Sequence, residues 1–258
     1  MPELDADRAL LAEAAQKAGE IALRHFRNAP QVWNKPGDAG PVTEADLEVD
    51  AFLRGFLTQA RPDYGWLSEE TEDDAARLDS DRVFIVDPID GTRSFIQGEN
   101  SWSHSLAIAD KGQITAGHVY LPVKDLHYTA ALGQGATCNG AALKAAQRDT
   151  LAGADILATR PNMEAQNWRS LPQITRHHRP SLAYRLCLVA EGRFDAMLTL
   201  RDAWEWDIAA GTLIAAEAGV SVTDRKNVPL IFNRPDPASE GVIAANPALH
   251  QEIYAALR

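Results

Sequence analysis

The segment Val86-Asp87-Pro88-Ile89-Asp90-Gly91-Thr92 follows an apolar, β-branched run at 82–87 that predicts a strand. Its two aspartates are separated by a proline, which fixes φ, and are followed by a glycine, which permits a tight backbone approach. A turn of this composition can aim both carboxylates at one point. Oxygen ligands without a nearby His or Cys suit Mg²⁺ better than Zn²⁺, so the segment is a candidate magnesium site. The plain alternative is a strand-to-loop turn, where Asp, Pro and Gly are common.

Other metal and phosphate motifs do not fit the sequence. An EF-hand starting at Asp87 needs a glutamate at its twelfth position, which is Gly98 here. A Walker A loop is absent from the sequence. Gly133-Gln134-Gly135 weakly resembles a dinucleotide-binding loop, but it closes a run of predicted strands and opens no obvious helix, so it predicts a hairpin turn.

Composition and charge exclude several classes of partner. The chain has 258 residues and a net charge of −11, which argues against binding to nucleic acid or to an anionic membrane. Its N-terminus is acidic where a signal peptide would be basic, and no apolar run approaches the roughly 20 residues that span a bilayer. Cys138 and Cys187 form no spaced pattern, which predicts a reduced, cytoplasmic protein. A phosphate substrate would need bound cations to attract it to so acidic a chain.

The predicted elements describe a mixed α and β protein. Apolar residues at helical spacing predict helices over 6–27 and around 49–57, and four strands joined by turns predict an antiparallel meander at 82–87, 105–109, 114–121 and 126–132. Later strands are predicted near 155–159, 194–200, 219–223 and 241–244. Later helices are predicted near 181–191 and 207–218, and from Pro247 onward. The change of pattern predicts two subdomains, 1–143 and 144–258.

Further acidic segments support the metal-site interpretation. Val42–Asp46 precedes the second helix, where Thr43 and Asp46 also form a capping-box pattern. Glu69-Glu70 lies in an acidic run, most of which is typical of a solvated surface. Trp206–Gly211 opens a helix and places Asp207 in its first turn, where the helix dipole favours a carboxylate.

Together these segments resemble the inositol monophosphatase family, which also includes bisphosphate nucleotidases and fructose-bisphosphatases. The family pattern of Val-Thr-x-x-Asp, a Glu-Glu pair, Asp-Pro-Ile-Asp-Gly-Thr and Trp-Asp-x-Ala-Ala-Gly is matched in order. The resemblance extends from Lys35 to Gly219. It implies a layered α-β-α-β-α sandwich, part α+β and part α/β, with an antiparallel sheet first. It also implies a Mg²⁺-dependent phosphomonoesterase that uses a metal-activated water, is inhibited by lithium and forms a homodimer.

The resemblance also implies roles for individual residues. Glu69, Asp87 and the Ile89 carbonyl would bind one Mg²⁺, while Asp87, Asp90 and Asp207 would bind a second. Glu69 would help to place a third, looser ion. Asp46 and Thr92 are similar to the pair that orients and activates the attacking water. The backbone N–H groups expected to bind the phosphate belong to Gly91, Thr92 and Arg93.

The substrate stays open between two candidates. Many inositol-specific relatives carry a ring-binding glutamate before the Trp-Asp helix, and here that place falls on Thr199 or Leu200, with Asp202 and Glu205 nearby. Arg185 stands where bisphosphate nucleotidases tend to carry a lysine, although it could simply pair with a surface carboxylate. Inositol 1-phosphate or a similar polyol phosphate and 3′-phosphoadenosine 5′-phosphate are therefore both candidates.

A catalytically inactive metal-binding protein with the same fold is the alternative from another class. Such a protein would be expected to have lost some ligands. All the residues of the expected site are present, namely Asp46, Glu69, Asp87, Asp90, Thr92 and Asp207. The sequence therefore favours an enzyme.

Overall fold

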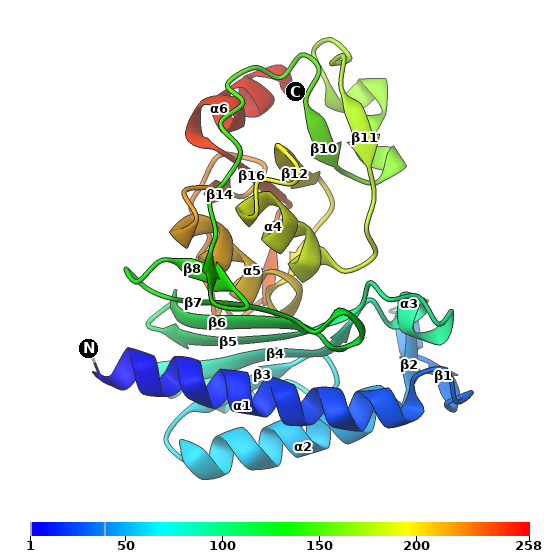
Figure 1. The fold of residues 1–258 in the computed structure, drawn as a ribbon, viewed down its shortest axis with the longest axis vertical. Coiled ribbons are helices and arrows are strands. Elements are labelled where there is room, and N and C mark those ends of the chain that lie inside the picture. Colours follow the sequence, from blue (N-terminus) through cyan, green and yellow to red (C-terminus); the bar gives the residue numbers. More distant parts are fainter. Residues whose placement is uncertain (1, 39) are drawn as a thin grey trace.

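A computed structural model describes residues 2–38 and 40–258, and its elements stack in alternating layers of helices and sheets (Figure 1). Two helices cover the outer face of the first sheet: α1 (Pro2–His25) and α2 (Glu44–Ala60). Two more lie between the first and second sheets: α4 (Leu182–Ala190) and α5 (Glu205–Glu217). Helix α6 (Pro247–Ala256) covers the far side of the second sheet, and the short α3 (Thr92–Ile96) follows the aspartate segment. The predicted α-β-α-β-α sandwich is confirmed.

The first sheet has seven strands in the order β3-β4-β5-β6-β7-β8-β9. Their bounds are β3 (Gly65–Ser68), β4 (Arg82–Asp90), β5 (Ser103–Asp110), β6 (Gln113–Leu121), β7 (Leu126–Ala131), β8 (Ala136–Cys138) and β9 (Ala141–Ala142). From β4 onward each strand pairs antiparallel with the next, which confirms the predicted meander and the hairpin at Gly133–Gly135. Strand β3, which runs parallel to β4, was not predicted because four residues are too few to show alternation.

The second sheet has five strands in the order β11-β10-β12-β16-β14. Their bounds are β10 (Asp155–Leu157), β11 (Thr175–His177), β12 (Ala196–Thr199), β14 (Ser221–Thr223) and β16 (Val242–Ala245). Two small ribbons complete the strands: β1 (Val32–Asn34) with β2 (Pro41–Thr43), and β13 (Ala203–Trp204) with β15 (Ala238–Ser239). Short 3₁₀ turns lie at Pro36–Asp38, Ala75–Asp79, Pro122–Lys124, Arg160–Met163 and Ala165–Asn167.

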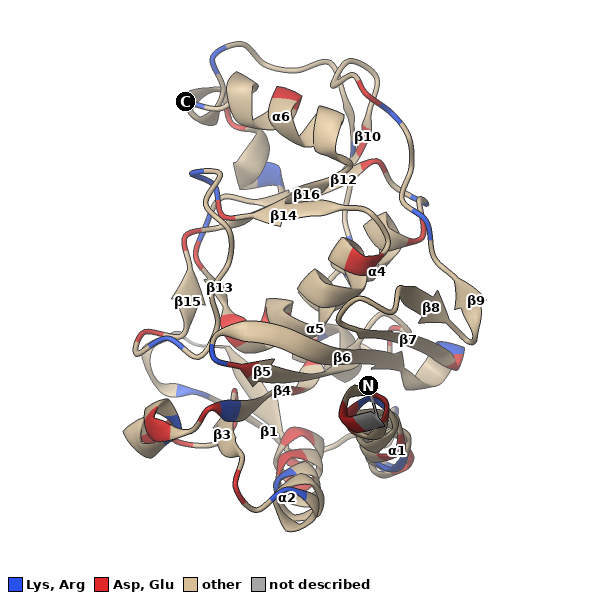
Figure 2. Cartoon of the chain, turned by 90° about the vertical axis from the view of Figure 1, so that its left-hand side faces the viewer, with Lys and Arg blue, Asp and Glu red and all other residues tan. Residues whose placement is uncertain are grey.

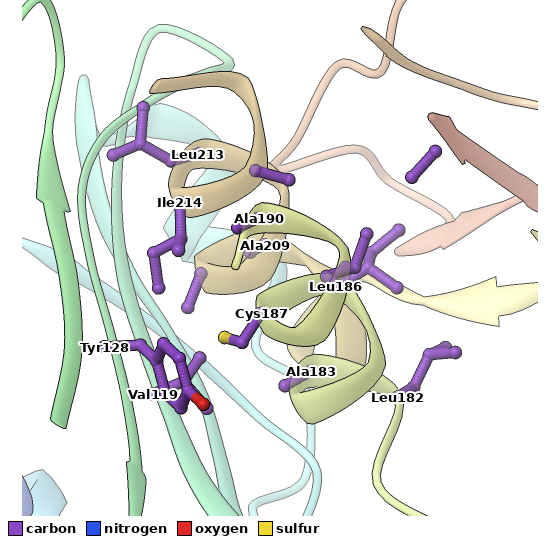
Figure 3. Close-up of a cluster of buried hydrophobic side chains, with 14 of the residues drawn as sticks. Val119, Tyr128, Leu182, Ala183, Leu186, Cys187, Ala190, Ala209, Leu213 and Ile214 are labelled. Carbon is purple, nitrogen blue, oxygen red and sulfur yellow. The ribbon is translucent and has the colours of Figure 1, made fainter. Parts of the chain in front are cut away.

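The main hydrophobic core lies between the first sheet and the central helices (Figure 3). Val119 and Tyr128 of the sheet pack in one buried cluster with Leu186 of α4 and Ile214 of α5. Helices α4 and α5 approach closely at Gly211, where an added Cβ would come within 2.7 Å of Leu186 Cδ1. Charged residues lie mostly on the outer helices and loops (Figure 2). The second half of the chain thus supplies helices that bury a face of the first sheet.

The aspartate segment departs from its predicted form. We expected a strand that ends at Asp87 and a turn after it, but β4 continues to Asp90. Asp87 pairs with Ser105 and Asp90 with Ser103, so the register shifts between them in a bulge. Residues three apart in a regular strand point to opposite faces, and a bulge changes that phase. The bulge falls at Pro88, which has no N–H to donate to the ladder.

The last strand of the first sheet ends near the predicted subdomain boundary. Strand β9 ends at Ala142 and the second sheet begins with Asp155. Helices α4 and α5 belong to the second segment but pack on the first sheet, so the two segments share one core. The division into 1–143 and 144–258 therefore stays a prediction. Among the described residues, no helix is both long enough and apolar enough to cross a membrane.

Candidate active site

Three carboxylates from distant segments meet at one point. Glu69 directly follows β3, Asp87 lies on β4, and Asp207 lies in the first turn of α5. One oxygen from each carboxylate lies within 4.8 Å of the others. Strand pairing sets the first two side by side, since Ser68 of β3 pairs with Val86 of β4. The packing of α5 on the same sheet brings Asp207 to them.

The electrostatics of this cluster call for a cation. Asp87 Oδ1 accepts a hydrogen bond from the Ile89 N–H at 3.0 Å, and its buried Oδ2 has no hydrogen-bond partner among the described residues. Burial raises the pKa of Asp87 well above its usual value, and the negative charges of Glu69, Asp90 and Asp207 raise it further. Burial and the charges of Asp90 and Glu69 likewise raise the pKa of Asp207. An oxygen-only set of close carboxylates fits a hard divalent cation such as Mg²⁺.

Lys35 forms ion pairs with two carboxylates of this acidic site, Glu69 and Glu70. Its Nζ donates to Glu69 Oε1 and to Glu70 Oε1, both at 2.7 Å. Burial, followed by the charge of Glu69, raises the pKa of Glu70 to about 7 despite this contact. One ammonium is therefore shared by two carboxylates, and it makes no ion pair with Asp87 or Asp207 among the described residues.

Asp90 joins the bulge of β4 to the start of α4. Its Oδ2 accepts hydrogen bonds from Ser181 Oγ and from the Ala183 N–H, both at 2.7 Å, and neither bond uses Oδ1. Burial raises the pKa of Asp90 to about 6, although these hydrogen bonds act to lower it. Ser181 was not among the predicted site residues. Its one sequence signal, a serine before an apolar run, indicates only a helix N-cap, which it also is.

Asp46 and Thr92 lie in direct contact. Asp46 Oδ2 accepts from the backbone N–H and the hydroxyl of Thr43, at 2.8 and 2.5 Å, which confirms the capping box. Its Oδ1 lies 3.1 Å from Thr92 Oγ1, and the Ile89 carbonyl lies at the same distance from that hydroxyl. Because Thr92 has one hydroxyl proton, it donates to one of these two oxygens at a time. Burial raises the pKa of Asp46 to about 6.

The start of α3 lies beside this pair. Gly91 precedes the helix with φ of 101°, a left-handed conformation that favours glycine. The first N–H groups of a helix have no intrahelical acceptor, so those of Thr92 and Arg93 are available to an anion. The side chain of Arg93 is exposed. Binding of phosphate by Gly91, Thr92 and Arg93 stays a prediction.

The two side chains predicted to contact the substrate are engaged within the protein. Arg185 is buried, and its Nε donates to the Arg179 carbonyl at 2.5 Å, so it holds the loop before α4 rather than a surface carboxylate. Glu205 is also buried and accepts from the N–H groups of Asn233 and Arg234, at 2.7 and 3.0 Å. Substrate contacts by either residue stay a prediction.

The positions considered for a ring-binding carboxylate differ in exposure. Thr199 is buried in β12, and Leu200, which follows that strand, is half-buried. Asp202 is exposed. Of the acidic candidates, Asp202 is therefore the one whose carboxylate is not already held inside the protein.

A carboxylate cluster that could hold a metal ion, built on this layered sandwich, is the arrangement expected of a metal-dependent phosphatase. The sequence model of the inositol monophosphatase family matches residues 3–258, so the chain belongs to that family and is a phosphoric monoester hydrolase. An inositol-1-monophosphatase of Rhizobium meliloti (strain 1021) is 34% identical over 225 residues, which cover 83% of this chain and 84% of the relative.

Other relatives carry different names. The 3′(2′),5′-bisphosphate nucleotidase CysQ of Escherichia coli (strain K12) is 30% identical over 224 residues, covering 85% of this chain and 91% of that protein. The crystal structure of the extragenic suppressor protein suhB from Bartonella henselae has a TM-score of 0.82 at 31% identity and covers 97% of both chains. The inositol-1-monophosphatase and the bisphosphate nucleotidase both act on small phosphate monoesters, and they differ in which one.

Proposed function

We propose that this protein is a Mg²⁺-dependent phosphatase that hydrolyses inositol 1-phosphate or a similar polyol phosphate. The observation that carries the proposal is the meeting of Glu69, Asp87 and Asp207 within 4.8 Å. In the described part of the chain, the buried Oδ2 of Asp87 also has no hydrogen-bond partner. Two Mg²⁺ ions, and a third looser one beside Glu69, would balance these charges. The proposed ligands are Glu69, Asp87, Asp90, Asp207 and the Ile89 carbonyl.

Bound magnesium would supply charge neutralisation for the phosphoryl oxygens and lower the pKa of the attacking water. In our proposal Thr92 accepts a hydrogen bond from that water and donates its own hydroxyl proton to Asp46 Oδ1. Asp46 suits this role because a pKa of about 6 leaves it ionised at neutral pH yet basic enough to hold the donated hydrogen bond. The N–H groups of Gly91, Thr92 and Arg93 would bind the phosphate oxygens.

The proposal also covers lithium inhibition, oligomeric state and location. Inhibition by lithium and a homodimeric state rest on the family resemblance alone. A cytoplasmic location rests on Cys138 and Cys187, both of which are free thiols.

A bisphosphate nucleotidase is the second candidate, and a cationic cluster favours it. Arg185 Nη2 lies 3.1 Å from His178 Nε2, and Arg185 Nε donates to the Arg179 carbonyl. Burial lowers the pKa of His178, and the positive charges of Arg185, Arg176 and Arg179 lower it further. The same loop leads to Ser181, which contacts Asp90. A second phosphate on the substrate could be met here by charge-assisted hydrogen bonds.

A comparison of two substrates separates these candidates. We expect kcat/KM to be higher for inositol 1-phosphate than for 3′-phosphoadenosine 5′-phosphate. We also expect Arg185→Ala to leave the ratio of the two constants unchanged. Loss of the loop contacts of Arg185 would lower both constants together, so the ratio reports recognition and not damage to the loop.

The opposite result would establish the second candidate. That result is a preference for the nucleotide which Arg185→Ala reduces about 10- to 150-fold. Such a factor is equivalent to a charge-assisted hydrogen bond of about 1.5–3 kcal/mol. Arg185→Lys serves as the matched control, because it keeps the positive charge and loses the planar guanidinium group with its paired N–H donors.

A further inference from the structure

A second carboxylate on α2 holds the loop that carries Glu69. Asp50 lies one helical turn after Asp46 and is 7% exposed. Its Oδ1 accepts a hydrogen bond from Ser68 Oγ at 2.5 Å, and its Oδ2 accepts one from Thr71 Oγ1 at 2.7 Å. Ser68 and Thr71 directly flank the Glu69-Glu70 pair. One carboxylate therefore binds both ends of this short segment.

Additional hydrogen bonds complete the support of the 68–71 segment. Thr71 Oγ1 accepts from Trp66 Nε1 at 3.2 Å, and the Glu69 N–H donates to the Val86 carbonyl at 3.2 Å. The backbone of Glu69 is thus fixed on one side by β4 and on the other by α2. Its side chain reaches Asp87 and Asp207 and also accepts a hydrogen bond from Lys35.

A buried carboxylate at position 50 lowers the stability of the fold unless its oxygens are hydrogen-bonded. In residues 2–38 and 40–258, Asp50 makes no ion pair, and its two oxygens accept hydrogen bonds from two hydroxyl groups. Burying a charge without a partner of opposite sign costs free energy. A carboxylate, however, accepts hydrogen bonds on both oxygens at once, whereas an amide accepts on one only. Asp50 can therefore accept hydrogen bonds from Ser68 and Thr71, on either side of the Glu69-Glu70 pair, at the same time.

We propose that Asp50 is a positioning residue that sets Glu69 in its metal-binding place before the metal arrives. Residues four apart lie on the same face of a helix, so α2 presents Asp46 to Thr92 and Asp50 to Ser68 and Thr71. One rigid helix thereby fixes both the water-orienting pair and the ligand loop. This inference rests on the proposed metal site at Glu69.

The test separates hydrogen bonding from charge. Ser68→Ala combined with Thr71→Val removes both contacts and keeps the charge of Asp50, whereas Asp50→Asn removes the charge and keeps one acceptor. Mg²⁺ affinity is measured by calorimetry on metal-depleted protein, together with hydrogen exchange of the amides at 68–71. Glu48→Gln is the matched control, because Glu48 lies on the exposed side of the same helix and bonds to α1.

We expect the double variant to bind Mg²⁺ about 10- to 100-fold more weakly, the usual cost of losing an outer partner of a metal ligand. Amide exchange at 68–71 should become faster in the metal-free protein, and kcat at saturating Mg²⁺ should fall much less than the affinity. Adding Asp50→Ala to the double variant should change little more. Asp50→Asn should lie between wild type and the double variant, and Glu48→Gln should match wild type.

Two results would overturn the inference while leaving the metal site intact. One is a double variant that binds Mg²⁺ like wild type and only melts at a lower temperature. The other is a loss of affinity in Asp50→Asn with the double variant unaffected, because charge alone would then explain the effect. Failure of the wild-type protein to bind Mg²⁺ would instead reject the proposed function itself.

Discussion

Asp90→Asn is expected to lower kcat by about 10³-fold or more, the equivalent of about 4 kcal/mol of transition-state stabilisation. The change removes a negative charge from the acidic site and keeps the size of the side chain. An asparagine oxygen can still accept from Ser181 and Ala183, which hold Asp90 at 2.7 Å, so the fold should survive. Turnover on a phosphate monoester and the far-UV circular dichroism spectrum provide the two measurements. Wild-type turnover would show that the bulge of β4 has only a structural role.

The same variant should be more stable than wild type when metal is removed. Burial raises the pKa of Asp90 to about 6, above its value in the unfolded chain, so the folded protein binds this proton more tightly. Ionisation therefore destabilises the fold progressively as the pH rises from about 4 to about 6, and the full cost persists above that range. In chelator at pH 7.5, Tm of Asp90→Asn should exceed that of wild type by a few degrees, on the order of 1–2 kcal/mol. The difference should vanish near pH 4, and a lower Tm at pH 7.5 would contradict the argument that burial of the ionised Asp90 destabilises the metal-free fold.

Thr92→Ala and Asp46→Asn should each lower kcat by about 10²- to 10³-fold, and the double variant should lose little more. The two side chains act on one water in our proposal, so removal of either disables the unit. Asparagine at position 46 can keep the Thr43 contacts through its oxygen, but it offers an N–H to Thr92 where the carboxylate offered an acceptor. Multiplicative losses would mean that Asp46 only caps α2.

Two controls accompany this pair of substitutions. Thr92→Ser keeps the hydroxyl and should retain most of the activity. Mg²⁺ affinity should be nearly unchanged in Thr92→Ala and Asp46→Asn, because neither residue is a proposed ligand. A large loss of affinity in either variant would assign that residue to the metal site.

Local patterns predicted the first helices and the meander, whereas the α-β-α-β-α layering was implied by the family resemblance. The meander has alternating strands with turn residues between them, and α1 carries a long apolar stripe that includes Leu11, Ala14 and Ala18. The predicted bounds of α1, 6–27, differ from Pro2–His25, since helix ends depend on local hydrogen bonds that composition does not fix. The bulge at Pro88 was not predicted either, because it depends on the register of β4 against β5.

The roles of buried polar residues were the least predictable part of the site. The motif residues Glu69, Asp87 and Asp207 are separated by up to 138 positions, yet the structure places them together. Asp50 and Ser181 were missed, because their partners lie in distant segments and their local patterns are those of ordinary helix residues. Glu205 binds the backbone of a loop 28 residues away, a contact that no local pattern indicates.

The most direct test of the metal-dependent mechanism is a Mg²⁺ titration of exhaustively chelated wild-type protein, followed by calorimetry and by phosphatase activity in the same buffer. We expect chelated protein to be inactive, Mg²⁺ to restore activity, and the restoration to follow a binding isotherm with two ions per chain. Asp87→Asn in the same experiment should lose both the binding and the restored activity. Full activity after exhaustive chelation, or Mg²⁺ binding that Asp87→Asn leaves unchanged, would contradict the assignment of this carboxylate cluster as the catalytic metal centre.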